Sequence, residues 1–291
     1  MSSESRFRCY MNLMAFNSLP QSSSGPRGDF SQRLEVLCEA GFDGVQFADA
    51  ATREELAACR SLNLGIAASG RVNTTEEANV LAERAVGDGF ECATLHAGWG
   101  LEDDDEAGRL IEGVLQASQR WRIPLYVETH RATICQDMWR TVQFIQRFPE
   151  MRFNADFSHW YAGQEMVYGG FEKKLEFIQP VLDRVRFIHA RVATPGCIQV
   201  PAPGPNGEQP LYVKHFRQLW IASFQGFLRA AGPGDHMCFT PELLAPDIYY
   251  ARTFLNSAGL PAEESDRWEQ SLLLKEIGRE CFALAEAAAG K

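Results

Sequence analysis

The sequence has no long apolar run and no paired cysteines. No stretch approaches the roughly 20 consecutive apolar residues that a membrane-spanning helix needs. The eight cysteines stand singly without a Cys-x-x-Cys pair, a pattern typical of reduced thiols rather than of a disulfide framework or a thiolate zinc site. The first residues also carry no apolar segment of signal-peptide length. We therefore expect a cytoplasmic protein that does not enter a membrane.

Positive charge is scarce. The chain has 28 lysines and arginines against 38 aspartates and glutamates, which gives a formal net charge of −10. Sequence-independent binding of nucleic acid rests on a basic surface, so we expect no nucleic-acid partner. A small anionic substrate is not excluded, because a few arginines can gather locally around it.

A glycine-rich phosphate loop is also absent, because no Gly-x-Gly-x-x-Gly follows the first apolar run. Short apolar runs alternate with helical segments along the whole chain, which predicts parallel strands joined by helices. Eight such units in 291 residues favour a closed (β/α)8 TIM barrel, a fold of about 250 residues, as a single domain over 1–291. The predicted strands are 7–16, 44–49, 63–69, 92–97, 124–130, 152–157, 185–191 and 238–243.

The boundaries of the helices carry their own signals. The segments 52–55 and 74–77 read Thr-x-x-Glu and predict capping boxes, in which a hydroxyl and a carboxylate satisfy free amides of the first turn. Gly41 predicts the end of the preceding helix. The segment 194–212 is rich in proline and glycine and predicts an irregular rim loop, which is a lid, a contact of a homo-oligomer or a disordered insertion without a role.

Four polar residues stand near the ends of four apolar runs. They are Glu128, Asp156, His189 and Glu242. Burying a carboxylate costs several kcal/mol unless it is paired or binds a metal, and four such residues at matching points indicate a shared site. In a barrel the carboxyl ends of the strands meet around the active site. Three carboxylates and one imidazole favour one hard divalent ion, Mn²⁺, Mg²⁺ or Co²⁺, with Zn²⁺ as a further candidate.

Further polar or aromatic residues stand at corresponding points and are candidates for contact with a substrate. Arg191 shares a strand face with His189, because side chains alternate along a strand, and His130 shares one with Glu128 for the same reason. The full set of candidates is His96, His130, Arg131, His159, Trp160 and Arg191.

These motifs resemble those of the xylose isomerase-like TIM barrel superfamily, also described as sugar phosphate isomerases/epimerases. The segments that carry the resemblance are Val127-Glu-Thr-His130, Asp156-Phe-Ser-His159, His189-Ala-Arg191 and Pro241-Glu-Leu243. The resemblance implies that Glu128, Asp156, His189 and Glu242 hold one divalent cation and that Glu128 and Glu242 also move protons. It implies that His159 binds a substrate oxygen. In the keto-sugar epimerases of this family the corresponding arginine comes later in the loop than Arg191 does here.

The resemblance implies a metal-dependent isomerase or epimerase of a keto sugar or related polyol, acting by proton transfer alpha to a carbonyl through an enediolate. The main alternative is a metal-dependent dehydratase or lyase acting on a keto-cyclitol or sugar derivative, because loss of a β-hydroxyl uses the same metal and base. A third reading is a non-catalytic sugar-binding barrel, since a fold alone does not imply activity. In each case the expected ligand is a small carbohydrate.

Overall fold

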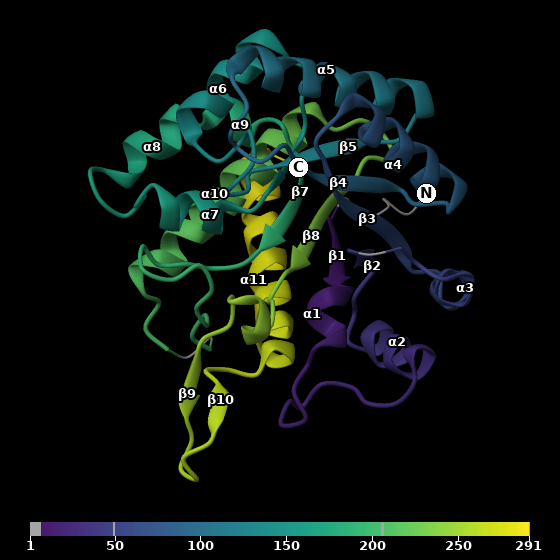
Figure 1. The fold of residues 1–291 in the computed structure, drawn as a ribbon. Helices are drawn as coiled ribbons and strands as arrows, with labels where there is room; N and C mark the ends of the chain where they lie inside the picture. The colour runs from purple at the N-terminus through teal and green to yellow at the C-terminus, as the bar shows by residue number, and fades with distance from the viewer. Residues whose placement is uncertain (1–6, 49, 205–206, 291) are drawn as a thin grey trace.

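The structure is a computed structural model that describes residues 7–48, 50–204 and 207–290. In these residues eight parallel strands close into a barrel, in which each strand pairs with its neighbours in the chain and β1 pairs with β8. The prediction of a (β/α)8 TIM barrel is thereby confirmed (Figure 1). Its strands are β1 (Phe7–Asn12), β2 (Gly44–Phe47), β3 (Gly65–Val72), β4 (Cys92–Ala97), β5 (Leu125–Glu128), β6 (Phe153–Ala155), β7 (Val185–Ala190) and β8 (Met237–Pro241).

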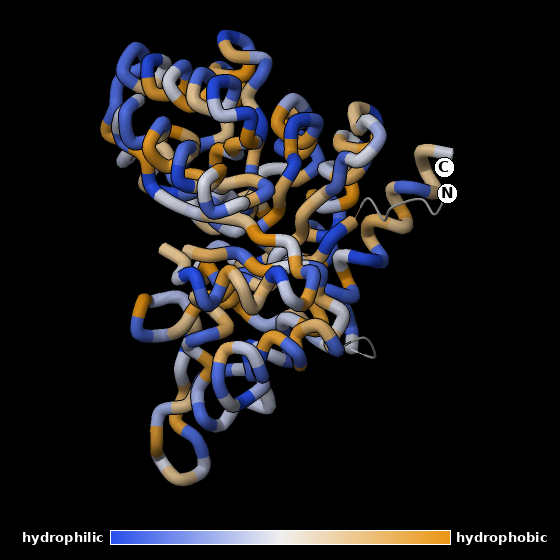
Figure 2. The backbone as a smooth tube through the Cα atoms, turned by 90° about the vertical axis from the view of Figure 1, so that its right-hand side faces the viewer, coloured by the Kyte–Doolittle hydropathy of each residue, from blue (hydrophilic) through white to orange (hydrophobic). Residues whose placement is uncertain are grey.

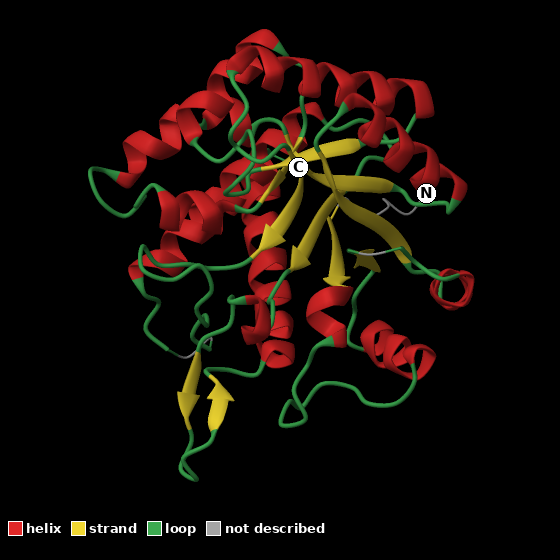
Figure 3. Cartoon of the chain, viewed as in Figure 1, coloured by secondary structure: helices red, strands yellow, loops and turns green. Residues whose placement is uncertain are grey.

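Helices surround the strands, as the red and yellow elements of Figure 3 show. No helix in the described ranges is long and apolar enough to cross a bilayer. The helices are α1 (Leu13–Asn17), α2 (Phe30–Glu39), α3 (Arg53–Ser61), α4 (Thr75–Gly87), α5 (Asp104–Trp121), α6 (Met138–Arg147), α7 (Phe157–Gly163), α8 (Phe171–Phe177), α9 (Gln179–Leu182), α10 (Leu211–Ala230) and α11 (Arg267–Ala288).

The apolar side chains form two groups, because residues alternate between the two faces of a strand. The larger group lies between strands and helices and includes most buried leucines, valines and phenylalanines. Figure 2 shows apolar (orange) segments running through the interior of the molecule. The smaller group gathers one residue from each of five strands: Tyr10, Ala67, Cys92, Phe187 and Cys238. A buried polar layer follows toward the carboxyl ends of the strands, where Asn12 donates to Gln46 (3.1 Å) and Gln46 donates to Thr94 (2.9 Å).

Capping residues and glycine explain where most helices begin and end, and two of the sequence-based predictions are corrected. The capping box at Thr52 is present, and Gly41 follows α2 with a φ of 76°, in the left-handed region that glycine adopts readily. Thr74 caps α4, but the Glu77 carboxylate accepts from the amide of residue 73 rather than from that of Thr74 itself. The predicted strand 7–16 is wrong beyond Asn12, because the Asn12 side chain accepts from the amide of residue 15 and begins α1.

The connections after β7 and β8 are the irregular ones. Helix α10 begins at Leu211, so the proline-rich segment after β7 ends before the predicted residue 212, and residues 205–206 of it lie outside the described part. After β8 come the short helix η1 (Pro246–Ile248) and a hairpin of β9 (Thr253–Leu255) and β10 (Pro261–Glu263). The hairpin projects on the side toward which the arrows of β7, β8 and β1 point (Figure 1). Both connections therefore border the carboxyl ends of the strands.

Candidate metal centre

The structure brings the four predicted ligands together at the carboxyl ends of four neighbouring strands. Glu128 is the last residue of β5, Asp156 directly follows β6, His189 lies in β7 and Glu242 directly follows β8. Glu128, Asp156 and His189 are buried, and the side chain of Glu242 is 13 % exposed. Nδ1 of His189 lies 3.3 Å from Oε2 of Glu128 and 3.4 Å from Oε1 of Glu242. Glu128 and Glu242 therefore both contact His189 at this end of the barrel.

The donor set fits a divalent cation. Asp156, His189 and Glu242 each offer one ligand atom within 4.8 Å of the others, and Glu128 belongs to an overlapping group with Asp156 and His159. Oε1 of Glu128 is buried and has no hydrogen-bond partner among the described residues, which leaves a charged oxygen for which a cation is the natural partner. Carboxylate oxygens with one imidazole suit Mg²⁺ or Mn²⁺ better than a thiolate-preferring metal.

Two amide side chains orient the ring of His189. Oε1 of Gln46 lies 2.9 Å from Nε2 of His189 and accepts a hydrogen bond from it, which leaves Nδ1 facing the carboxylates. The amide of Asn154 donates to Oε2 of Glu128 (2.9 Å) and contacts Nδ1 of His189 (3.1 Å). Burial acts to lower the pKa of His189, but the Glu242 and Glu128 carboxylates raise that pKa to about 9. Sequence reasoning missed Gln46 and Asn154, although a polar residue in the middle of an apolar strand was a usable signal.

The two glutamates have different electrostatic surroundings. Burial acts to raise the pKa of Glu128, but the nearby His189 and His96 imidazoles hold that pKa well below its ordinary value. The pKa of Glu242 is raised, chiefly by burial, against the opposing effect of His189 and Arg191. Glu128 is therefore the more readily ionised of the two carboxyl groups.

Arg191 is fully buried between the predicted ligands. Its guanidinium forms a short ion pair with Oδ2 of Asp156 and lies 3.2 Å from Oε2 of Glu242. It also donates to the hydroxyl of Ser158 (3.1 Å) and lies 4.5 Å from the centre of the Tyr250 ring. Burial acts to raise the pKa of Asp156, and the guanidinium lowers it instead. The structure thus brings Arg191 into contact with two of the predicted acidic ligands.

The three predicted substrate histidines form a row beside the ligands. The ring of His130 lies 4.1 Å from that of His96 and 3.8 Å from that of His159, measured between centroids. His96 contacts Glu128 (3.3 Å), and His159 contacts Oδ2 of Asp156 (3.4 Å). Burial, with the neighbouring His159, lowers the pKa of His130 to about 2, so its ring is neutral.

Arg131 and Trp160 have different surroundings from each other. Arg131 is exposed and lines a cavity of about 610 Å³ together with His159, Tyr250 and the loop after β7. Trp160 is fully buried, and its indole donates to the carbonyl of Cys135 (2.9 Å), which indicates a packing role. Tyr250 was not foreseen, because the loop after β8 shows no periodic pattern.

The chain matches no family model, and no curated protein matches its sequence. Its structure is similar to a D-tagatose 3-epimerase-like protein (TM-score 0.60, 10 % identity, 97 % of this chain and 100 % of the other). It is also similar to a xylose isomerase-like TIM barrel protein from Mycobacterium smegmatis in complex with magnesium (TM-score 0.58, 16 % identity, 99 % of both chains). A third similar structure is the probable 3-DHS dehydratase AsbF from Bacillus anthracis (TM-score 0.56, 14 % identity, 83 % and 94 %). The resemblance seen in the sequence extends to the fold: the chain has a (β/α)8 barrel like those of these similar structures.

Proposed function

We propose that the protein is a divalent-metal-dependent isomerase or epimerase of a keto sugar or related polyol, acting by proton transfer alpha to a carbonyl. The observation that carries the proposal is the placement of two carboxylates beside one imidazole. Oε2 of Glu128 and Oε1 of Glu242 lie 3.3 Å and 3.4 Å from Nδ1 of His189 and approach it from different strands. Two carboxylates that come from separate strands can reach opposite faces of one carbon and act there as base and acid.

The residues have separate proposed roles. Glu128, Asp156, His189 and Glu242 would hold the ion, which supplies Lewis-acid polarisation of the substrate carbonyl and so acidifies the adjacent C–H. Glu128, the more readily ionised carboxyl group, accepts that proton to give an enediolate. In an isomerase, Glu242 donates a proton to the neighbouring carbon while the hydroxyl proton of the first carbon moves to the former carbonyl oxygen. In an epimerase, Glu242 donates a proton to the opposite face of the same carbon.

The neighbouring cavity supports a small polar substrate. It has a volume of about 610 Å³ and borders the ligands through His159, while Arg131 and Tyr250 line its wall. A volume of this size accommodates a monosaccharide. His159, His130 and His96 would contact hydroxyl oxygens, because an imidazole donates hydrogen bonds and, where it is neutral, also accepts them. The similarity to a D-tagatose 3-epimerase-like protein supports the same class of substrate.

A dehydratase is the second candidate, because one of the similar structures is a probable 3-DHS dehydratase. It would use the same proton abstraction and then lose a β-hydroxyl as water.

The test is incubation of the Mn²⁺-loaded protein with a panel of ketoses in D₂O, followed by NMR and mass spectrometry. We expect deuterium at the carbon next to the carbonyl of at least one ketose, and loss of exchange after EDTA treatment. Glu128→Gln and Glu242→Gln should reduce exchange about 10²- to 10⁴-fold. Glu264→Gln is the matched control, since this glutamate pairs with Arg252 in the hairpin rather than joining the centre. A dehydrated product would select the second candidate, and no exchange with any ketose would count against the reaction class.

A further inference from the structure

Arg191 contacts two of the proposed metal ligands directly. Its guanidinium binds Oδ2 of Asp156 and lies 3.2 Å from Oε2 of Glu242, so one cation already touches two of the four proposed ligands. The side chain is fully buried. No other lysine or arginine in the described ranges forms an ion pair with any of the four residues.

Asp156 has little capacity left for a second cation. Its Oδ1 accepts hydrogen bonds from the amide (3.0 Å) and the hydroxyl of Ser158, and its Oδ2 takes the guanidinium. Arg191 also donates to that same hydroxyl (3.1 Å). The imidazole of His159 also lies 3.4 Å from Oδ2. A metal ion that binds Asp156 therefore competes with protein donors, and among them Arg191 stays charged whatever the pH.

Electrostatic repulsion between the guanidinium and a divalent ion strengthens their competition for Asp156. A guanidinium and a divalent ion that share a carboxylate lie within about 5 Å of each other, where their repulsion is substantial even at an effective dielectric constant of about 20. An arginine stays protonated and cannot relieve the repulsion by losing its charge. The repulsion therefore either weakens metal binding or displaces the guanidinium, which now lies 4.5 Å from the centre of the Tyr250 ring beside the cavity.

We infer that Arg191 is a resident cation that competes with the divalent ion for Asp156 and Glu242 and so weakens metal binding. The inference rests on the proposed function, because it takes these residues as metal ligands. It differs from a supporting role, in which Arg191 would hold the carboxylates in place for the metal. The two roles predict opposite changes in metal affinity when the charge of Arg191 is removed.

The experiment is calorimetric titration of the EDTA-treated, full-length protein with Mn²⁺. Removal of the charge in Arg191→Met should tighten binding at least about tenfold, whereas Arg191→Lys keeps the charge and should stay within a few-fold of the original affinity. Arg252→Met is the matched control: it removes an arginine that pairs with Glu264 in the hairpin, and it should leave the affinity unchanged. Unchanged or weaker binding by Arg191→Met would overturn the inference.

Loss of the guanidinium leaves two buried carboxylates without their cation, and this can destabilise the metal-free variant. Arg191→Gln provides a second test, because its neutral amide still donates to Asp156. For both neutral variants, saturating Mn²⁺ should raise the unfolding temperature more than it does for the original protein, because tighter binding of the folded state stabilises it more. A smaller rise in both variants would also overturn the inference.

The outcomes separate the two proposals. If the original protein binds Mn²⁺ and the neutral variants bind no better, the competition fails while the proposed function stands. If only the neutral variants bind, the competition is supported and the metal-dependent function of the original protein fails. If none of them binds, both fail.

Discussion

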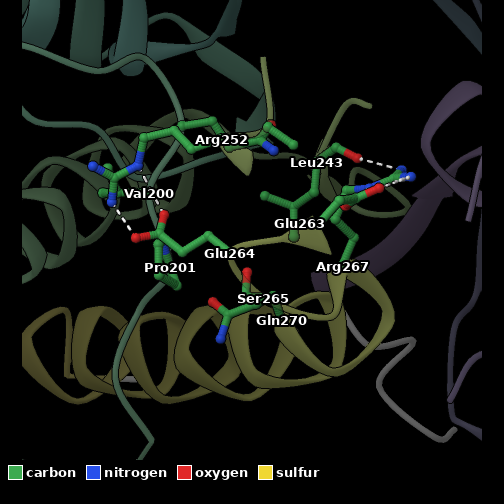
Figure 4. A pocket seen from close by; sticks show the side chains of 11 residues that line it. Val200, Pro201, Leu243, Arg252, Glu263, Glu264, Ser265, Arg267 and Gln270 are labelled. Atoms are coloured by element: carbon green, nitrogen blue, oxygen red, sulfur yellow. Dashed lines mark hydrogen bonds and ion pairs between the residues drawn. The ribbon is translucent and has the colours of Figure 1, made fainter. Parts of the chain in front are cut away.

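Two arginine–glutamate pairs lie where the hairpin after β8 meets α11 (Figure 4). They differ mainly in burial, and we predict very different losses of stability when each is broken. The side chains of Arg267 and Glu263 are 3 % and 10 % exposed, whereas those of Arg252 and Glu264 are 41 % and 24 % exposed. Arg267 also donates to the carbonyls of residues 15 (2.9 Å) and 243 (3.2 Å). It therefore joins α1, which follows β1, to the segment that follows β8.

The magnitude follows from this burial. Arg267→Met leaves a buried carboxylate and several carbonyls without their donor, which costs about 3–5 kcal/mol of the free energy of unfolding. Arg252→Met breaks an exposed pair and should cost no more than about 1 kcal/mol. At about 2 °C per kcal/mol for a chain of this size, the unfolding temperature should fall by about 6–10 °C and by at most about 2 °C, respectively.

Urea denaturation followed by far-ultraviolet circular dichroism measures both losses under the same conditions. A change in the midpoint with an unchanged slope would show that the variants differ in stability rather than in the cooperativity of unfolding. If the loss for Arg267→Met does not exceed that for Arg252→Met, burial of the pair is not what gives it its strength, and the reasoning is refuted.

Three further variants test the centre. Asn154→Leu removes the amide that contacts Glu128 and His189, so Mn²⁺ affinity should fall about 10- to 100-fold in calorimetry, and an unchanged affinity would argue against this role. Trp160→Phe loses an indole hydrogen bond and should cost about 1–3 kcal/mol of unfolding free energy while Mn²⁺ affinity stays the same; weaker Mn²⁺ binding would contradict a packing role. His130 has its pKa lowered from 6.5 to about 2, so the unfolded chain binds the extra proton and stability falls as the pH drops below about 6.5. His130→Phe should reduce the loss measured in EDTA between pH 7 and pH 5, and equal losses would exclude this cause.

The barrel and its four proposed ligands could be predicted from the sequence because both follow from local patterns. Apolar runs of strand length alternated with capped helices, and each ligand interrupted or ended such a run. In a parallel barrel every strand ends on the same side, so a position along the chain translates directly into a position in space. Glu128 and Glu242, which are 114 positions apart, could be brought together without any knowledge of loops.

The contacts of Arg191 and Tyr250 could not be predicted in the same way. Strand alternation placed Arg191 on the same face as His189, but the distance from its guanidinium to Asp156 depends on the length and direction of a flexible side chain. Tyr250 lies in a loop after η1, where no periodicity relates sequence to position. Loops contribute much of a binding site and carry the weakest local signals.

The three carboxylates of the centre are not equivalent, and the difference bears on the proposed mechanism. Both oxygens of Asp156 accept from protein donors, and those of Glu242 face Asn12 (3.2 Å) and Arg191 (3.2 Å). Oε1 of Glu128 has no such partner in the described part of the chain. Oε1 of Glu128 thus has no protein donor to lose when it binds a cation or a proton, whereas Oε2 of Glu242 must first give up the guanidinium. If Arg191 withdraws when the metal binds, the same movement frees Glu242 for proton return, so metal loading and completion of the reaction would depend on one side chain.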